Sequence, residues 1–219
     1  PRRVAAHASR MRKLLDANGY GKAESHLTEW NYVRGWSGEW VHSMRAESGD
    51  RQELGAAFTA AVLTELQSSS VTLAHYYDAR PGTSMNGLFH PVTARTMRGY
   101  YPFYAWSNLR DLGTCVFARA ASPEKDVYVT AAKGIDDALG VLVVRFDHDL
   151  NVIMSRRVDL RVNGRSVAGM RAHMTDYASV YTEFHPAVKA EDTVSFALEP
   201  NAFVYLELPG REEKKGEAK

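Results

Sequence analysis

Cysteine is almost absent from this sequence of 219 residues, in which Cys115 is the only one. A single cysteine excludes an intrachain disulfide and argues against a thiolate metal cluster. Cys115 lies in the apolar run Thr-Cys-Val-Phe-Ala, so we expect a packed strand residue rather than a reactive thiol. The eight histidines form no His-Glu-x-x-His motif, and we therefore expect no metal site.

Excess charge and long apolar runs are lacking as well. The formal net charge is +1, which provides no global field to attract nucleic acid or an anionic membrane. No stretch of about 18 uncharged apolar residues is present, so no membrane span is expected. The sequence also has no Gly-rich phosphate loop and no apolar secretory core near its start. We expect no cofactor, and a soluble, cytoplasmic chain is slightly favoured, although the compartment stays unknown.

Helix-like and strand-like patterns alternate over residues 1–112. Short, turn-bounded, aromatic-rich segments predict strands, and 3.6-residue periodicity predicts helices. The predicted order is a helix at 3–17, a strand at 25–32, a helix from an Asp50 capping box to about 67, a strand at 71–77 and a helix at 100–112. This α-β-α-β order is typical of an α/β protein, in which chemistry lies at the carboxyl ends of the strands.

After Gly113 the period changes to that of strands. Asn163-Gly164 predicts a two-residue hairpin between strands at 158–162 and 165–170. Further strands are predicted at 126–132, 139–146, 193–198 and 203–208. Several short strands at this spacing predict an antiparallel β-sandwich over residues 113–209, and the charged residues 210–219 predict a disordered tail.

The segment Thr28-Glu29-Trp30-Asn31 is the sharpest candidate for chemistry. Glu29 falls at the end of a predicted strand, where a carboxylate is held rigidly and faces the mouth of a barrel. Glycoside cleavage with retention needs two carboxyl groups about 5–5.5 Å apart, one of which attacks the anomeric carbon. On these four residues alone, a structural glutamate in a strand-end salt bridge remains the favoured alternative, because short motifs give many false matches.

The stretch His26-Leu-Thr-Glu-Trp-Asn31 resembles the seventh-strand nucleophile motif of glycoside hydrolase family 39, which groups β-xylosidases with α-L-iduronidases. The match continues in order through the following segments: 71–80, 86–89, 99–104 and 199–208. The resemblance implies α/β plus all-β architecture, with the C-terminal portion of a (β/α)8 barrel in residues 1–112 and an accessory β-sandwich in 113–209. It also implies that Glu29 is the nucleophile of a double-displacement mechanism without a cofactor.

One departure from that family is large. Its acid/base glutamate lies in an Asn-Glu pair, and no Asn is directly followed by Glu in this sequence. The first six barrel strands have no counterpart here, and a typical barrel needs about 250 residues. A complementing chain then supplies the rest, or the chain is a non-catalytic carbohydrate-binding module or an inactive fragment. Exposed barrel edges predict a homo-oligomer or such a complementing chain.

Other side chains near the two strand ends are weaker candidates for binding a carbohydrate substrate. Trp30 and Trp36 stack on sugar rings or simply pack in the core. Tyr76, Asp78 and Arg80 are candidates for binding sugar hydroxyl groups at the second strand end. Arg80 grips a uronate carboxylate or pairs with Asp78 within the loop, an alternative that is slightly favoured. Asn31, directly after the glutamate motif, contacts a substrate hydroxyl or turns the chain.

Overall fold

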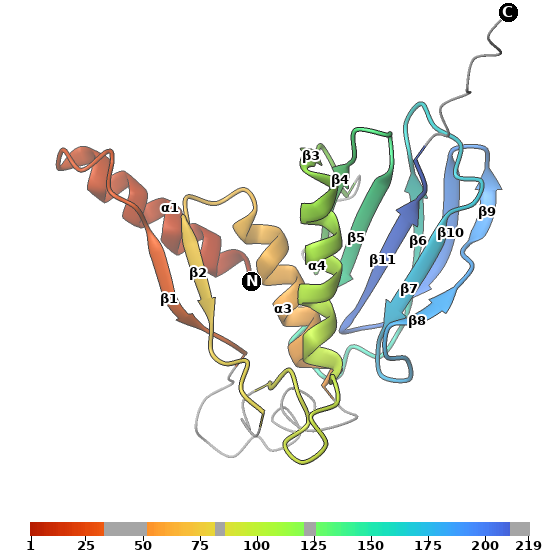
Figure 1. The fold of residues 1–219 in the computed structure, drawn as a ribbon, viewed down its shortest axis with the longest axis horizontal. Helices are drawn as coiled ribbons and strands as arrows, with labels where there is room; N and C mark the ends of the chain where they lie inside the picture. The colour runs from red at the N-terminus through yellow and green to blue at the C-terminus, as the bar shows by residue number, and fades with distance from the viewer. Residues whose placement is uncertain (33–51, 82–85, 121–125, 211–219) are drawn as a thin grey trace, which may run out of the picture.

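The computed structural model describes residues 1–32, 52–81, 86–120 and 126–210. Two lobes are joined by a pair of helices near the middle of the chain (Figure 1). The first part of the chain forms, in order, α1 (Arg2–Ala17), β1 (His26–Trp30), α3 (Glu53–Leu66), β2 (Leu73–Tyr76), the short 3-10 helix η2 (Arg98–Tyr100) and α4 (Tyr101–Leu112). The predicted helix–strand alternation is therefore present, and the bounds shift by a few residues at most.

Helices α3 and α4 owe their bounds and burial to particular residues. Helix α3 is rich in alanine and apolar on all sides, and Leu54, Ala56 and Val62 are fully buried, as expected of a helix surrounded by protein. Helix α3 begins at Glu53, directly after the cap residue Gln52. The predicted cap, Asp50, lies outside the described residues. Helix α4 ends at Gly113, whose φ of 89° is readily adopted only by glycine.

Strands β1 and β2 form a two-stranded parallel sheet. His26 is aligned with Leu73, Leu27 with Ala74, and Trp30 with Tyr76, with an irregularity between Leu27 and Trp30. Because the strands are parallel, their carboxyl ends meet at one edge, at the bottom of Figure 1. Trp30 is the only buried residue of these two strands, and most of the others are exposed.

The remaining strands form two antiparallel sheets. A six-stranded sheet has the order β3-β4-β5-β11-β7-β8, and a three-stranded sheet has the order β6-β10-β9. The strands of the large sheet are β3 (Thr114–Val116), β4 (Val127–Lys133), β5 (Leu139–Arg145), β7 (Arg171–Thr175), β8 (Thr182–Phe184) and β11 (Ala202–Leu208). Those of the small sheet are β6 (Arg156–Arg161), β9 (Ala187–Ala190) and β10 (Thr193–Leu198).

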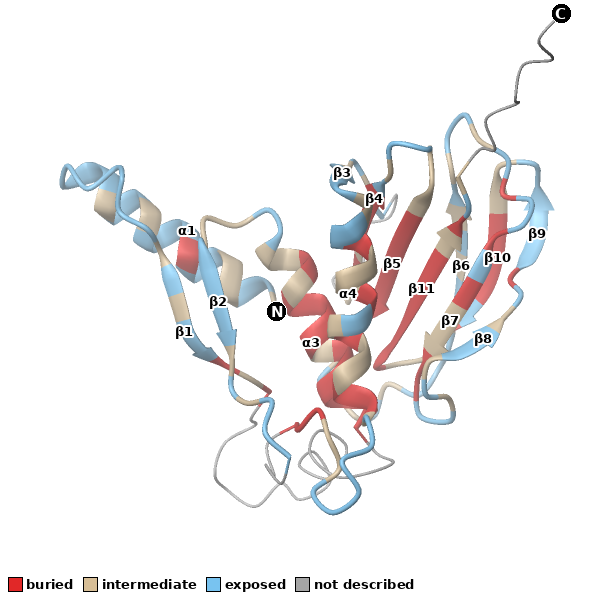
Figure 2. Ribbon diagram, viewed as in Figure 1, coloured by how far each residue is buried: buried red, intermediate tan, exposed pale blue. Residues whose placement is uncertain are grey.

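The central strands β5 and β11 of the large sheet are buried on both faces and appear red in Figure 2. Side chains alternate along β5, so that Val141 and Val143 face the small sheet while Leu142 and Val144 face α3 and α4. Strand β11 alternates in the same way, with Phe203 among the residues on the helical side. Burial on two faces explains the continuous apolar run at 139–144, because neither face of the strand meets water.

Two local predictions are wrong. Gly164 adopts a φ of 72° in a turn, but no strand follows at 165–170, and β6 pairs with β10 instead. The Asn163-Gly164 turn therefore connects two sheets rather than two hairpin strands. Cys115 lies on a strand as predicted, but β3 is a short edge strand and the Cys115 side chain is exposed rather than packed.

Candidate active site

The candidate nucleophile, Glu29, lies on β1 one residue before the strand ends, and it is exposed. The residues that follow anchor this strand end to the rest of the protein. Trp30 is 8% exposed and Tyr32 is 6% exposed. An exposed carboxylate next to anchored backbone is held in a narrow range of positions, which suits a group that must meet a reacting carbon.

Three aromatic rings hold the Trp30 side of that anchor. The Trp30 ring meets the Tyr76 ring edge-on with 5.1 Å between centroids, and the Phe103 ring lies 6.3 Å from Trp30 and 5.0 Å from Tyr76. Edge-on contacts at these separations are favourable beyond the burial of the rings. The structure thus places Trp30 in a packed cluster. Its indole Nε1 is buried without a hydrogen-bond partner among the described residues.

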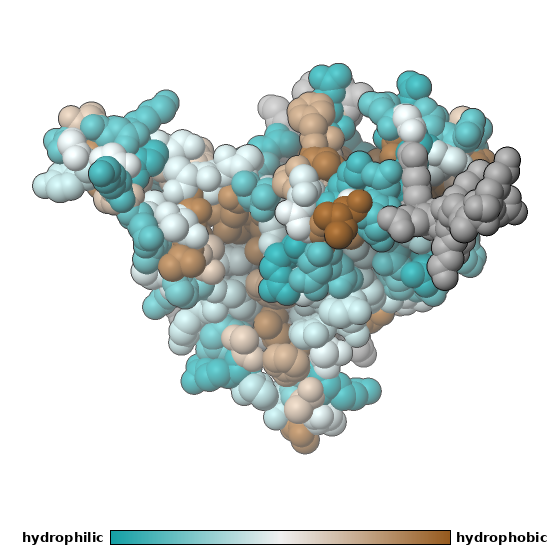
Figure 3. All heavy atoms as spheres, turned by 45° about the horizontal axis from the view of Figure 1, so that its top comes forward, coloured by the Kyte–Doolittle hydropathy of each residue, from teal (hydrophilic) through white to brown (hydrophobic). Residues whose placement is uncertain are grey.

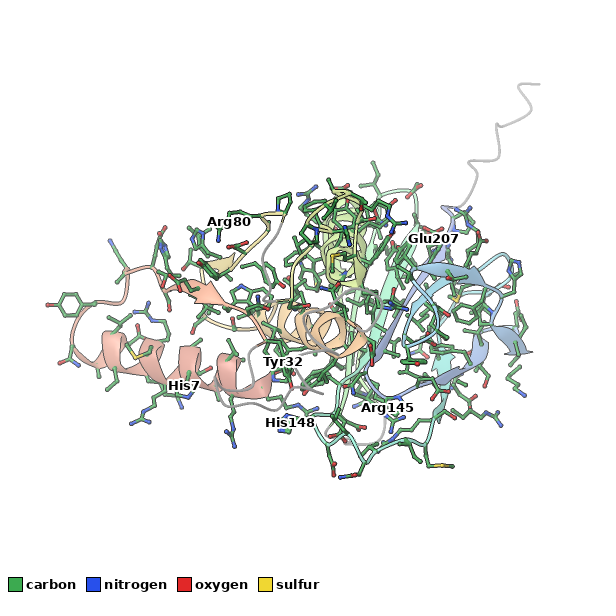
Figure 4. All side chains as sticks on the ribbon, turned by 90° about the horizontal axis from the view of Figure 1, so that it is seen from below. His7, Tyr32, Arg80, Arg145, His148 and Glu207 are labelled. Atoms are coloured by element: carbon green, nitrogen blue, oxygen red, sulfur yellow. The ribbon has the colours of Figure 1, made fainter. Side chains whose placement is uncertain are left out.

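Tyr32, two residues after Trp30, anchors the end of β1 to α3 and to the large sheet. Its ring packs 5.0 Å from that of Phe58 on α3 and 5.9 Å from that of Phe146, which follows β5. Tyr32 is labelled near the centre of Figure 4, between the lobe that carries α1 and the sheets. The end of β1 is therefore tied both to β2 and to the large sheet.

Asn31, between these two anchors, forms a hydrogen-bond network with the buried amide of Asn86. Its Nδ2 donates to the carbonyl oxygen of Tyr77, and its Oδ1 accepts from Asn86 Nδ2 at 3.2 Å. The same Asn86 nitrogen lies 3.2 Å from the Gly55 carbonyl oxygen and from Thr59 Oγ1. Asn31 thus connects the ends of β1 and β2 to helix α3 through Tyr77 and Asn86.

Tyr76 lies at the end of β2, and its hydroxyl donates to the carbonyl oxygen of Asn86. Burial raises the pKa of Tyr76 above its usual value, because the charged phenolate is disfavoured away from water. The phenol is therefore protonated at neutral pH. The peptide bond between Tyr77 and Asp78 is cis.

Asp78 and Arg80 form the loop pair that was one of the two alternatives for these residues. Arg80 Nη2 lies 2.8 Å from Asp78 Oδ2, and the Arg80 backbone N–H donates to Asp78 Oδ1 at 3.0 Å. These bonds favour the charged carboxylate and hold the pKa of Asp78 below its ordinary value. The Arg80 side chain is 75% exposed and projects from the edge of the molecule in Figure 4.

The structure brings together six of the seven candidate residues at the carboxyl ends of β1 and β2, and the seventh, Trp36, lies outside the described residues. Sequence reasoning did not assign a site role to Asn86 or Phe103, which both contact this region. The Asn86-Gly87 pair is a sequence signal for a tight turn. Asn86 has a positive φ of 45°, a conformation that asparagine tolerates. Phe103 carries no such signal, since aromatic residues are frequent in the first half of helix α4.

The described residues contain no group of three or more His, Cys, Asp or Glu side chains that could hold a metal ion. None of the helices among these residues is long and apolar enough to cross a bilayer. Among the described residues, the strand ends offer one exposed carboxylate, an ion pair, amides and a phenol.

Comparison with solved structures shows a glycoside hydrolase-like fold. A glucosidase from Croceicoccus marinus matches 97% of this chain and 52% of its own, at a TM-score of 0.68 and 15% identity. A family 30 subfamily 8 xylanase from Clostridium acetobutylicum matches 85% of this chain and 43% of its own, at a TM-score of 0.60 and 14% identity.

A family 39 β-xylosidase from Caulobacter crescentus also matches, over 94% of this chain and 48% of its own, at a TM-score of 0.59 and 15% identity. No protein-family model and no curated protein sequence matches. The chain spans about half the length of these solved structures. Because families 30, 44 and 39 are all represented, the fold is shared with glycoside hydrolases without selecting one family.

Proposed function

We propose that this chain carries the nucleophile side of a retaining glycosidase site, of the β-xylosidase or iduronidase type. In this proposal residues 1–112 are the closing part of a (β/α)8 barrel and residues 113–209 are its accessory β-sandwich. The observation that carries the proposal is the placement of Glu29, which is exposed at the anchored carboxyl end of a parallel strand in a glycoside hydrolase-like fold. Parallel strand ends are where barrel enzymes place their catalytic groups.

The proposed reaction is a double displacement. The Glu29 carboxylate attacks the anomeric carbon and forms a glycosyl ester while the bond to the leaving oxygen breaks and that oxygen takes up a proton. Water then attacks the same carbon, gives up a proton to a base, and releases the sugar and the free carboxylate. The proton donor is a second carboxyl group. Since the sequence has no Asn-Glu pair, we assign that donor to another polypeptide segment rather than to a residue described here.

The other residues of the strand ends have supporting roles in this proposal. Asp78 and Arg80 present a charged pair beside the strand ends, where a guanidinium can bind a uronate carboxylate or sugar hydroxyls. Asn31 and Tyr76 hold the two strand ends in register through Tyr77 and Asn86. Trp30 supports Glu29 from beneath through its ring contacts.

A dinitrophenyl glycoside tests the nucleophile without the missing acid, because its leaving group departs without being protonated. We expect the chain to release about one equivalent of dinitrophenol from dinitrophenyl xyloside or a related glycoside and to retain the sugar as an ester. Mass spectrometry of the digested protein should find that ester on Glu29. Glu29→Gln should lower the release by about a thousandfold or more, as removal of a nucleophile does.

Glu24→Gln is the matched control, because Glu24 is an exposed glutamate at the opposite end of β1, paired with His26. This variant should react like the unaltered chain. Equal release by Glu29→Gln would contradict the assignment of Glu29. No release by the unaltered chain from any glycoside would contradict catalysis by this chain and favour a carbohydrate-binding module or an inactive fragment.

The β1–β2 sheet has the features of a surface that binds a second polypeptide. Among the described strands β1 and β2 pair only with each other, so each has a free edge that can accept another strand. Leu73 is 49% exposed and Met11 on α1 is 52% exposed. Apolar surface is visible in the recess between this lobe and the rest of the molecule (Figure 3). We propose a complementing chain or a second copy at these edges, and light scattering of the pure chain should show self-association that Leu73→Lys reduces.

A further inference from the structure

A cavity of about 310 Å³ opens between the carboxyl end of α4 and the large sheet. Its floor comes from the start of β5, the start of β7 and the end of β11. This end of β11 lies at the top of Figure 1, whereas β1 and β2 point toward the bottom. Glu207 and Arg80 are likewise far apart in Figure 4. The cavity is therefore separate from the strand ends that carry Glu29.

Five polar side chains from three elements converge on this cavity. Helix α4 contributes Asn108 and Asp111, strand β7 contributes Arg171, and strand β11 contributes Tyr205 and Glu207. Small-molecule sites are commonly concave, at least about 300 Å³ in volume, and lined by apolar groups with a few polar groups that fix the ligand's orientation. Both the size and the lining of this cavity fit that description.

The two carboxylates of the cavity are only partly used by the protein. Arg171 Nη2 lies 3.0 Å from Glu207 Oε1, so the pair crosses between β7 and β11. Arg110 donates to Asp111 Oδ1 through Nε at 3.0 Å and through Nη2 at 2.8 Å. Within the described part of the chain, Asp111 Oδ2 and Glu207 Oε2 accept no hydrogen bond. Each carboxylate therefore has an oxygen that can accept from a ligand hydroxyl.

The charge of the cavity is balanced, because each carboxylate has an arginine partner. A balanced site selects neither an anion nor a cation. Tyr205 adds a phenol that makes no hydrogen bond to a described residue and whose pKa burial raises above its ordinary value. A protonated phenol can both donate and accept. The polar side of the cavity thus suits several adjacent neutral hydroxyl groups.

The rest of the lining is apolar. Leu112 of α4, Ala138 just before β5, and Pro209 just after β11 supply apolar surface to the lining. A pyranose or furanose ring has polar hydroxyl groups around its rim and an apolar C–H face, which matches this division. From this arrangement we propose that the cavity binds a neutral sugar ring, with Asn108, Asp111 and Glu207 as hydrogen-bond partners of its hydroxyl groups.

The proposal can be tested by NMR titration of the full chain with xylose, xylobiose, glucose and cellobiose, with glucuronate as the charged comparison. The side-chain amide of Asn108 reports binding directly. We expect saturable shifts with at least one neutral sugar. Asp111→Ala should weaken its affinity about fivefold or more, which corresponds to the loss of one hydrogen bond.

Asp111→Ala should fold normally, because a negative charge in the last turn of a helix is unfavourable and Asp111 is exposed. Asp16→Ala is the matched control, since Asp16 is an exposed aspartate in the last turn of α1 and also pairs with an arginine. That variant should bind like the unaltered chain. A second cavity variant, Asn108→Ala, should weaken binding as Asp111→Ala does.

Three results would overturn this proposal: no saturable shift with any neutral sugar, unchanged affinity in both cavity variants, or tighter binding of glucuronate than of the neutral sugars. Glu29→Gln separates this site from the proposed active site. Binding that survives Glu29→Gln supports the cavity whether or not Glu29 is a nucleophile. Binding that is lost in Glu29→Gln and kept in the cavity variants places the sugar at the strand ends and excludes the cavity.

Discussion

The parallel pair β1–β2 and the antiparallel pair β5–β11 belong to the same chain and have opposite surroundings. Every residue of β11 except Glu207 is buried, and β5 is buried from Gly140 onward. In the parallel pair only Trp30 is buried. The central antiparallel strands find partners for both faces within the described residues. A two-stranded sheet alone is marginal in water, so β1 and β2 depend on their anchored ends.

The difference in burial between the two strand pairs can be tested most directly by truncating one leucine in each pair. Leu206 on β11 is fully buried and Leu73 on β2 is 49% exposed. Leu206→Ala should lower the free energy of unfolding by about 2–5 kcal/mol, because it removes buried methyl groups and leaves a cavity. Leu73→Ala should change it by less than about 1 kcal/mol. Urea denaturation followed by circular dichroism measures both, and equal losses would show that β2 is buried in solution, for example by self-association.

Two glycines sharpen the contrast in packing. A Cβ atom at Gly140 on β5 would lie 2.9 Å from Leu112 Cδ1 and 2.9 Å from Tyr205 Oη. Gly140→Ala should therefore cost about 1–3 kcal/mol, as overpacking of a dense core does. Gly21, in the turn before β1, has no neighbour closer than 3.7 Å to such an atom, and Gly21→Ala should be nearly neutral. Thermal denaturation compares the two variants, and a stable Gly140→Ala protein would mean that Leu112 and Tyr205 move freely.

The smallest expected effect concerns pH at the end of β2. The Asp78 carboxyl has a pKa below its ordinary value because of Arg80. A lowered pKa in the folded state stabilises the fold above the unfolded pKa of about 3.9, and this contribution is lost as the pH falls through the folded value. Arg80→Ala should raise the pKa of Asp78 toward its ordinary value in an NMR titration. Arg110→Ala, at a distant ion pair, should leave that titration unchanged, and a shift there would point to a change of overall fold.

How far the sequence predicts the fold differs between these regions. Strand β10 matches its predicted bounds, and β11 begins one residue early, since period-two patterns and turns mark them locally. The pairing of β6 with β10 could not be predicted, because Asn163-Gly164 signals a turn but not which strands it joins. The exposure of Cys115 was missed because an apolar run does not say whether its strand lies at the edge of a sheet.

At the candidate site, sequence reasoning found the strand ends but not what holds them. The sequence predicts that Trp30 and Tyr76 each lie near the end of a strand, and the structure aligns the two residues with each other. Asn86 and Phe103 are distant in sequence, and their contact with these ends depends on the packing of α4 and of the preceding loop. Such long-range contacts leave no local pattern. The Asp78–Arg80 pair, two residues apart, could be anticipated because its partners are neighbours in the chain.

The core that α3, α4 and the large sheet share limits where the gene can be recombined. Helix α4 passes directly through Gly113 into β3, and the sheet face that the two helices cover carries Tyr128, Leu142 and Phe203. If the gene were divided at the codon for Gly113, the separated sheets would expose a large apolar face, and such faces promote aggregation. Recombination that keeps this core covered must therefore move α3 and α4 together with the sheets, so Gly113 is not a useful exchange point.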